Sequence, residues 1–217
     1  MYGLPGQSAQ RWSETLDKAL SVTPEHLSIY ELTLEENTPF AVQAQRGLLR
    51  LPAEDKVLAM MDVTVKLITT AVLKRYEISN YARPGRECRH NINYWQNGSY
   101  IGLGPGAVSC LSGRRLTAVA DVEQFCRYLE IGKDFWSHEE ALETEVRFRE
   151  TVIMGLRMIT GVSLERLRER FGINAIDYYG KTLSGMLDQD LLVVEDQFLR
   201  LTKKGLPVAN AVMAELV

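Results

Sequence analysis

Residues Tyr76–Ser109 read YEISNYARPGRECRHNINYWQNGSYIGLGPGAVS, and this stretch is the most informative part of the chain. A strand-like run at 76–79 leads into a polar loop that contains Pro84 and Gly85, and a dense block of polar and aromatic residues follows at 90–95. Four glycines come next: Gly98, Gly102, Gly104 and Gly106. Polar loop residues between aromatic ones are typical of a binding surface on a scaffold. We therefore predict a binding loop that the rest of the chain supports.

The residues before this stretch predict helices that alternate with strands. Ser8 is the expected N-cap of a helix with Trp12 and Leu16 on its inward face. Residues 27–34, LSIYELTL, alternate in the manner of a strand, and Lys74–Ser79 predict a second, short strand. A long helix is expected over Ala53–Leu73, with these residues facing inward: Val57, Met60, Met61, Val65 and Ile68. The chain opens at what we interpret as the end of an earlier strand.

After the central stretch, a strand is expected over 100–111, with a return strand at 116–120 and a helix that Asp121 caps. From Glu139 onward the pattern is helical. It predicts three helices, a two-stranded wing and a last helix, at 143–158, 164–171 (capped by Ser163), 175–189, 191–195 with 198–202, and 206–216. This order is typical of a winged helix. We place the domain boundary near Ser137, between residues 1–136 and 137–217.

Composition excludes several classes of function. The chain has 217 residues, enough for one large or two small domains, and its net charge of −3 provides no field for nucleic acid or anionic lipid. The helix at 175–189 carries Lys181 as its single basic residue, so we expect no nucleic-acid binding. No apolar run approaches the ~20 residues of a membrane span, and the first residues show no export signal.

The cysteines and histidines are widely scattered along the sequence. Cys88, Cys110 and Cys126 form neither a disulfide framework nor a metal motif, because no two lie within four residues of each other. Free thiols suit a reducing compartment, so we predict a cytoplasmic protein. The sequence contains no local zinc or iron–sulfur site.

His90 has two possible roles. A lone histidine in a loop is commonly a structural residue held by hydrogen bonds. Here Asn91 and Asn93 are able to orient the imidazole, while Tyr94 and Trp95 supply a flat apolar wall. Cys88 adds a second soft ligand nearby. An imidazole or a thiolate beside aromatic rings is what haem iron and a porphyrin face require. For residues 102–106, GLGPG, the spacing differs from a dinucleotide loop and favours a close approach of two backbones.

Three motifs resemble one known family. They are residues 2–7, YGLPGQ, residues 76–85, YEISNYARPG, and above all residues 88–95, CRHNINYW. They look like the radical S-adenosylmethionine haem chaperones called HemW, formerly named oxygen-independent coproporphyrinogen III oxidase-like. The resemblance implies an α/β (α+β) fold, with the C-terminal part of a partial (β/α) barrel followed by a winged-helix-like domain. It also implies haem binding at His90, Asn91, Tyr94, Trp95 and Cys88, with His90 as the ligand of the haem iron.

Two departures from the family pattern matter. The family's cluster motif, C-x-x-x-C-x-x-C, is absent, so this chain alone is not expected to ligate [4Fe-4S] or S-adenosylmethionine. Val108 stands where the family commonly has histidine. By resemblance, Val108 and Thr33 are possible remnants of the S-adenosylmethionine site. We interpret the chain as the C-terminal part of such a protein.

Three functions remain open at this stage. The first is haem trafficking to an unknown acceptor protein. The second is docking of a partner, including the missing N-terminal half or a second copy of the chain. The third is a fragment of an enzyme like oxygen-independent coproporphyrinogen III oxidase, which is less favoured because that chemistry needs a cluster.

Overall fold

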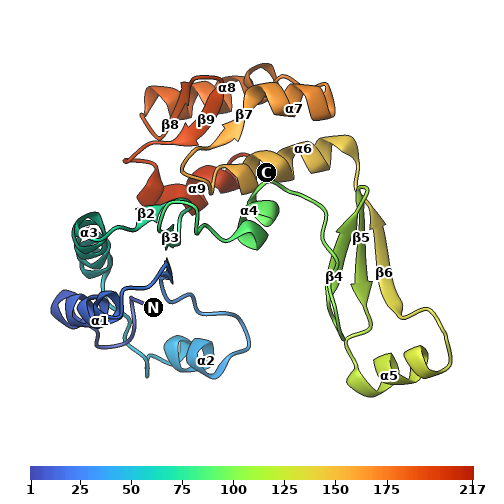
Figure 1. Ribbon diagram of the computed structural model, residues 1–217, viewed down its shortest axis with the longest axis horizontal. Helices are drawn as coiled ribbons and strands as arrows, with labels where there is room; N and C mark the ends of the chain where they lie inside the picture. Colours follow the sequence, from blue (N-terminus) through green and yellow to red (C-terminus); the bar gives the residue numbers. More distant parts are fainter. The chain divides into compact units, whose positions relative to one another are not determined.

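The computed structural model describes every residue from Met1 to Val217 as a mixture of helices and small antiparallel sheets (Figure 1). The predicted mixture of helices and strands is therefore confirmed. The chain divides into two compact units, Met1–Cys88 and Arg89–Val217. The domain boundary predicted near Ser137 differs from this division, because Ser137 lies within a strand of the second unit. That boundary stays a prediction. None of the helices has the length and apolar character that a membrane crossing requires.

The first unit packs two long helices beside a small sheet. Its elements are α1 (Ala9–Ser21), β1 (His26–Ser28), α2 (Pro39–Gln45), α3 (Glu54–Thr70), β2 (Lys74–Arg75) and β3 (Asn80–Ala82). The three strands are antiparallel in the order β1-β3-β2. Trp12 of α1 is 2% exposed, and its indole Nε1 donates to Thr64 Oγ1 of α3 over 2.8 Å. This contact fixes the two helices against each other inside an apolar core.

Several predictions for the first unit were wrong in detail. The strand expected at 27–34 is only β1, and beyond it Glu31 forms a single parallel bridge with Tyr2. The strand expected over Lys74–Ser79 turns instead at Glu77, because the buried Glu77 Oε1 accepts from the Ser79 backbone N–H over 2.9 Å. A helix, α2, lies in the predicted loop, and Val65 is 53% exposed rather than inward-facing.

The second unit contains two three-stranded sheets and most of the helices. Its elements are α4 (Arg89–Trp95), β4 (Val108–Leu111), β5 (Arg114–Ala118), α5 (Val122–Glu130), β6 (Trp136–Ala141), α6 (Thr144–Gly155), β7 (Val162–Ser163), α7 (Leu164–Phe171), α8 (Ala175–Asp188), β8 (Leu192–Glu195), β9 (Phe198–Leu201), the 3₁₀ helix η1 (Leu206–Val208) and α9 (Ala209–Ala214). The sheets are antiparallel, in the orders β4-β5-β6 and β7-β9-β8.

The helix caps predicted in the second unit are confirmed, whereas two of its segments were misassigned. Asp121 accepts from the Gln124 backbone N–H over 2.7 Å, and Ser163 accepts from Arg166 in the same way. The block at 90–95 forms the helix α4 and not a loop. Residues from Glu139 were expected to be helical, but Trp136–Ala141 pair with β5 as the strand β6.

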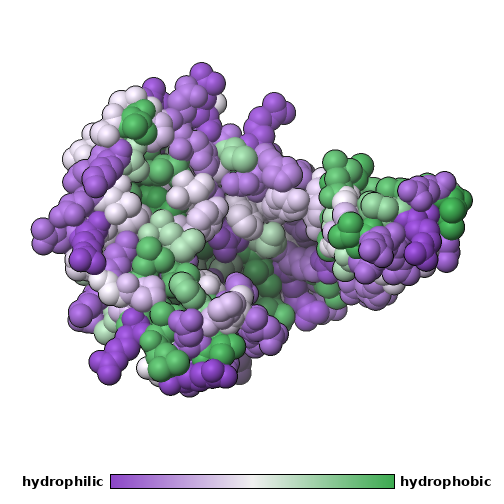
Figure 2. Space-filling model, turned by 90° about the horizontal axis from the view of Figure 1, so that it is seen from below, coloured by the Kyte–Doolittle hydropathy of each residue, from purple (hydrophilic) through white to green (hydrophobic).

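The glycine-rich loop between α4 and β4 is held by a close backbone approach, as predicted. Tyr100 bridges to Cys110, and the strand expected over 100–111 is interrupted between these two residues. A Cβ atom on Gly102 would lie 2.3 Å from the carbonyl oxygen of Val108, so only glycine fits there. Leu103 is 89% exposed. Figure 2 shows further hydrophobic side chains on the part built from β4–β6 and α5, at the right of the view.

Candidate functional site

The short helix α4 carries the block that the sequence singled out, and its C-terminal end is fixed from two sides. The Arg170 guanidinium donates to the carbonyl oxygens of Gln96 and Asn97, over 3.3 and 2.9 Å. Asn97 has a positive φ of 48°, and its Nδ2 donates to Thr151 Oγ1 over 3.0 Å. Because Thr151 belongs to α6 and Arg170 to α7, both of these helices position the end of α4.

His90 lies exposed at the start of α4. Its imidazole packs edge-on against Tyr94, with ring centroids 4.8 Å apart and an interplanar angle of 87°. The two residues are one helical turn apart, which brings their side chains together. Tyr94 in turn lies 4.7 Å from Tyr100. The ring nitrogens of His90 make no hydrogen bond within the protein, so a neutral imidazole keeps its lone pair for a ligand.

The asparagines of the block do not orient the imidazole. Asn93 Nδ2 donates to the backbone oxygen of Ser99 over 3.0 Å, which ties α4 to the start of the glycine-rich loop. Asn91, which is half-buried, makes no hydrogen bond to His90. The predicted orientation by Asn91 and Asn93 is therefore not found in the structure.

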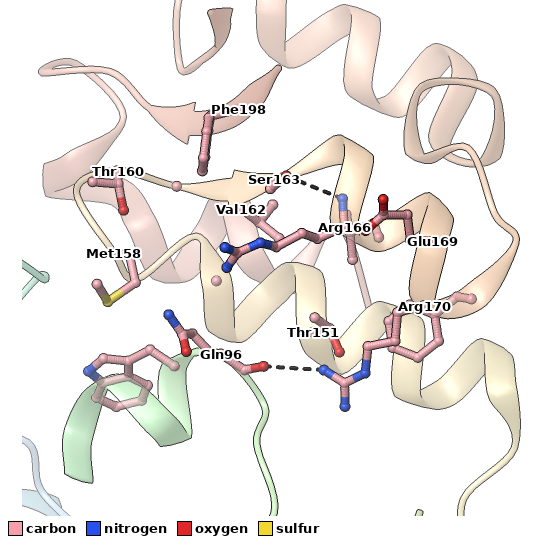
Figure 3. A pocket seen from close by; sticks show the side chains of 15 residues that line it. Gln96, Thr151, Met158, Thr160, Val162, Ser163, Arg166, Glu169, Arg170 and Phe198 are labelled. Atoms are coloured by element: carbon pink, nitrogen blue, oxygen red, sulfur yellow. Dashed lines mark hydrogen bonds between the residues drawn. The ribbon is translucent and has the colours of Figure 1, made fainter. Parts of the chain in front are cut away.

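Trp95 lines a large cavity that His90 and Tyr94 do not line. This cavity has a volume of about 550 Å³ and is formed with residues of α6, β7 and α7 (Figure 3). The guanidinium carbon of Arg157 lies 4.3 Å from the centroid of the Trp95 ring, a cation–π contact that holds the indole. Tyr94 and Trp95 therefore do not form the single wall that was predicted, because Trp95 lines this cavity and Tyr94 does not.

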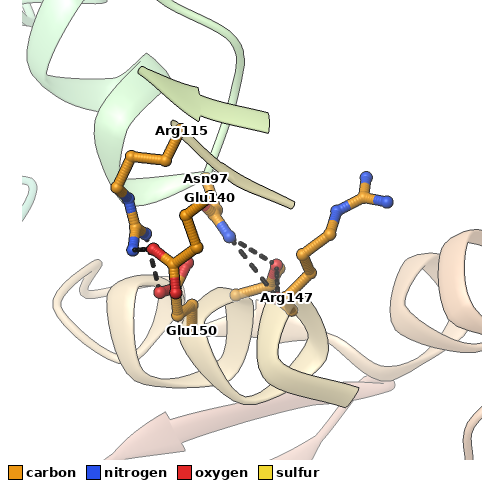
Figure 4. Close-up of polar contacts among 6 residues, drawn as sticks. Asn97, Arg115, Glu140, Arg147 and Glu150 are labelled. Atoms are coloured by element: carbon orange, nitrogen blue, oxygen red, sulfur yellow. Dashed lines mark hydrogen bonds and ion pairs between the residues drawn. The ribbon is translucent and has the colours of Figure 1, made fainter. Parts of the chain in front are cut away.

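Tyr94 and Tyr100 line a smaller cavity of about 220 Å³, together with Met154 of α6. An ion-pair network borders it, in which Arg115 of β5 contacts Glu150 over 2.7 Å and Glu140 over 3.2 Å (Figure 4). The hydrogen bond that Arg115 donates to Glu150 is the main cause that raises the pKa of Arg115 above its usual value. Through these two ion pairs, the permanently charged guanidinium of Arg115 links β5 and β6 to α6.

The remaining predicted site residues are not part of α4. Cys88 has a half-buried free thiol and is the last residue of the first unit. Thr33 is exposed in the same unit. Val108 begins β4, and its backbone packs on Gly102. The structure therefore brings together His90 and Tyr94 among the predicted residues of the second unit.

The residues that contact and surround α4 but lie far from it along the chain were not predicted from the sequence. Arg166 and Arg170 line the larger cavity, but they come about 70 residues after α4 and belong to no motif. The single local signal was the Ser163 cap, which fixed where α7 begins. Their position relative to α4 depends on the tertiary fold.

The donor groups of the chain fit the two cofactors that the sequence resemblance implies to different degrees. An exposed imidazole without a hydrogen bond, beside a tyrosine ring, suits an axial ligand of haem iron. An iron–sulfur cluster needs several thiolates together. Cys126 is exposed on α5, Cys110 lies in β4, and no three His, Cys, Asp or Glu side chains gather into a metal-binding group. The thiols of this chain do not fit a cluster.

The comparisons with known proteins give first a class and then a closer relationship. Residues 142–208 match the family described as the HemN C-terminal domain. The fold is shared with the structure of coproporphyrinogen III oxidase HemN from Escherichia coli, described as a radical SAM enzyme. That match has a TM-score of 0.77 and 17% sequence identity, and it covers 99% of this chain and 53% of the other. The fold is thus of the HemN type.

Sequence similarity identifies closer relatives of this chain within that class. The chain is 32% identical over 217 residues to the protein named heme chaperone HemW from Lactococcus lactis, covering 100% of this chain and 57% of that protein. It is also 32% identical over 213 residues to heme chaperone HemW from Bacillus subtilis, covering 98% and 56%. The predicted resemblance is confirmed, and the chain is a homologue of the proteins named heme chaperone HemW. It spans about half the length of these relatives.

Proposed function

We propose that this chain is the haem-handling part of a haem-trafficking chaperone and that His90 supplies an axial ligand to the haem iron. The observation that carries the proposal is the His90 imidazole, which is exposed, makes no hydrogen bond and lies edge-on against Tyr94. Haem, when bound, supplies an iron that accepts a neutral imidazole nitrogen. The relatives' printed name, heme chaperone, supports the same function.

We also propose how the chain relates to a longer protein. Residues 1–136 represent the C-terminal part of a (β/α) barrel, and residues 137–217 a winged-helix-like domain. The parallel bridge between Tyr2 and Glu31 supports the first assignment, and the order of α6, α7, α8, the β8–β9 hairpin and α9 supports the second. In this account the [4Fe-4S] cluster is ligated by the half that this chain lacks. By the same proposal, Thr33 and Val108 are remnants of an S-adenosylmethionine site.

The partners follow from the same proposal. A chaperone delivers haem to an acceptor protein, and the missing half or a second copy of the chain docks on the barrel portion. The three free thiols suit a reducing compartment, which supports a cytoplasmic location. An oxidase activity is disfavoured because the thiols of this chain do not fit a cluster.

A haem titration followed by the Soret band tests the proposal. Wild type should give a saturable band, and His90→Ala should weaken binding by about tenfold or more, because it removes a bond to iron. His138→Ala is the matched control, since His138 is an exposed histidine on β6 outside the α4 region. If His90→Ala binds haem as wild type does, His90 is not the ligand.

The competing account makes His90 a structural residue. Since its imidazole is exposed and not hydrogen-bonded, His90→Ala should change the free energy of unfolding without haem by less than about 0.5 kcal/mol. A thermal melt of the haem-free variant measures this. A large loss that His90→Gln partly restores would favour the structural role.

A further inference from the structure

The larger cavity of the second unit has the dimensions of a small-molecule site. Its volume of about 550 Å³ lies within the range of roughly 300–1,000 Å³ that ligand pockets occupy. It is built from the C-terminal end of α4 and from α6, β7 and α7, and the tip of β9 contributes Phe198 (Figure 3). The contacts of Arg170 with the end of α4 hold this wall in place.

Much of the cavity wall is apolar and aromatic. The residues that give it this character are Trp95, Gly155, Met158, Val162, Leu167, Phe171 and Phe198. Leu167 is 1% exposed and Val162 8% exposed, so the floor belongs to the core of the unit. Gly155 and Gly161 leave room because neither carries a side chain, and a Cβ on Gly155 would approach Val162 Cβ to 2.7 Å. A flat apolar ligand gains by burying its faces against such rings.

The cationic groups around the cavity differ in how they are engaged. Arg170 is committed to the carbonyl oxygens of Gln96 and Asn97, and Arg157 lies over the Trp95 ring. Arg166 is different. Its backbone N–H bonds to Ser163 Oγ, but its guanidinium makes no hydrogen bond or ion pair. Figure 3 shows this side chain extended into the space between Val162, Gln96 and Thr160.

Arg166 is exposed on α7, and its unengaged guanidinium lies at the solvent side of the largely apolar cavity. This arrangement favours one ligand chemistry. Arginine presents paired N–H donors that match the two oxygens of a carboxylate, and such a contact is stronger than a hydrogen bond between neutral groups. Glu169 is the single acidic residue that lines the cavity, and Figure 3 shows its carboxylate apart from the Arg166 guanidinium. The lining therefore suits a ligand that is planar and apolar and ends in a carboxylate.

We propose that this cavity receives the carboxylate-bearing edge of a porphyrin and that Arg166 pairs with a propionate of the ring. The identity of the ligand rests on the proposed function, whereas the position of the contact rests on the cavity. His90 does not line the cavity and precedes Trp95 on α4. The iron-bearing centre of the ring is accordingly assigned to the His90 side and the propionate edge to Arg166.

The test compares two iron-free ligands on the full chain. Protoporphyrin IX carries both propionates, and its dimethyl ester has the same ring without the charges. Binding is followed by porphyrin fluorescence, so axial ligation plays no part. Arg166→Ala should weaken protoporphyrin IX binding by about tenfold or more and leave the ester within about twofold. Arg166→Lys should recover part of the loss because it restores the charge without the paired donors.

Matched variants on the same helix control for charge and folding. Arg168→Ala removes the same charge from α7, but Arg168 does not line the cavity, so it should bind both ligands as wild type does. Glu169→Gln should strengthen binding of protoporphyrin IX and leave the ester unchanged. Thermal melts of each variant confirm that it is folded.

The outcomes separate this inference from the proposed function. If Arg166→Ala binds protoporphyrin IX as tightly as wild type, or if wild type binds neither porphyrin, the Arg166 contact is disproved. If Arg166→Ala acts as expected while His90→Ala leaves the haem titration unchanged, the Arg166 contact stands and the iron ligand is not His90. If Arg166→Ala loses affinity equally for protoporphyrin IX and for the ester, Arg166 shapes the cavity but does not pair with the carboxylate. That result would also overturn the proposal.

Discussion

Gly161 occupies a position that a larger residue does not fit. Its φ of 76° lies in the left-handed region, and an added Cβ would lie 2.2 Å from the carbonyl oxygen of Leu199. The residue sits between α6 and β7, where the wall of the larger cavity turns. The positive φ and the crowding act together, so the backbone at this turn depends on glycine.

Gly161→Ala should therefore destabilise the protein by about 1–3 kcal/mol or more. Gly185→Ala is the matched control. Gly185 lies in the interior of α8 with open space around it, so alanine should stabilise by up to about 1 kcal/mol. Denaturant unfolding measures both. Equal effects of the two substitutions would show that the strain at Gly161 is absent.

Tyr2 links stability to high pH. Its ring is 8% exposed and lies 5.6 Å from the ring of Trp12. Burial, aided by the charge of Glu31, raises the pKa of Tyr2 from 10.0 to about 12. The folded state keeps the phenol proton where the unfolded state loses it. The resulting stability is complete below pH 10 and is lost as the pH rises from 10 to 12.

Tyr2→Phe should flatten this pH dependence, because phenylalanine has no proton to lose. The slope for one proton is at most about 1.4 kcal/mol per pH unit. Unfolding by denaturant at intervals from pH 9 to 11.5 gives the slope for each protein. Identical slopes for wild type and Tyr2→Phe would mean that Tyr2 titrates normally in the folded state.

The helix α4 depends on contacts from outside itself. It has only two turns, and a helix this short is not stable alone. Arg170 supplies two hydrogen bonds to the carbonyl groups that follow it, and Asn97 ties the same point to α6. The presentation of His90 and Trp95 is therefore controlled by α7, far along the chain.

Arg170→Ala should loosen α4 and lower stability by about 1–3 kcal/mol, since charge-assisted hydrogen bonds are lost. Hydrogen exchange of the amides in Arg89–Trp95 should accelerate. Arg168→Ala on the same helix should leave that exchange unchanged, because the hydrogen bonds to the end of α4 come from Arg170 and not from Arg168. Unchanged exchange in Arg170→Ala would place the support of α4 elsewhere.

Features encoded locally were predictable from the sequence. The Ser8, Asp121 and Ser163 caps need only a side chain that reaches an N–H three residues on, and all three were predicted. The α1 face of Trp12 and Leu16 was also predicted from its helical spacing. Such short-range rules hold in any tertiary context.

Features made by distant residues were not predictable in this way. The strand β6, WSHEEA, exposes most of its side chains, so it shows no alternation of buried and exposed residues. It forms a strand because β5 pairs with it and because Arg114 and Arg115 form ion pairs with Glu139 and Glu140. The larger cavity needs five separate segments, and none of them signals it alone.

At the scale of the whole molecule, the chain spans about half the length of its relatives. Its thiols do not gather into one group. Anaerobic reconstitution with iron and sulfide should therefore give no stoichiometric [4Fe-4S] spectrum. A stable cluster at one per chain would show that the cysteines come together in a way that this structure does not contain.

Ligand rescue tests whether this chain handles haem through His90. Ferric haem is bound at saturation to wild type and to His90→Ala, and the Soret position is recorded before and after addition of free imidazole. We expect His90→Ala to show a shifted band that returns to the wild-type position with imidazole, because the small molecule replaces the missing ligand. A His90→Ala band that already matches wild type, and that imidazole does not change, would contradict the account.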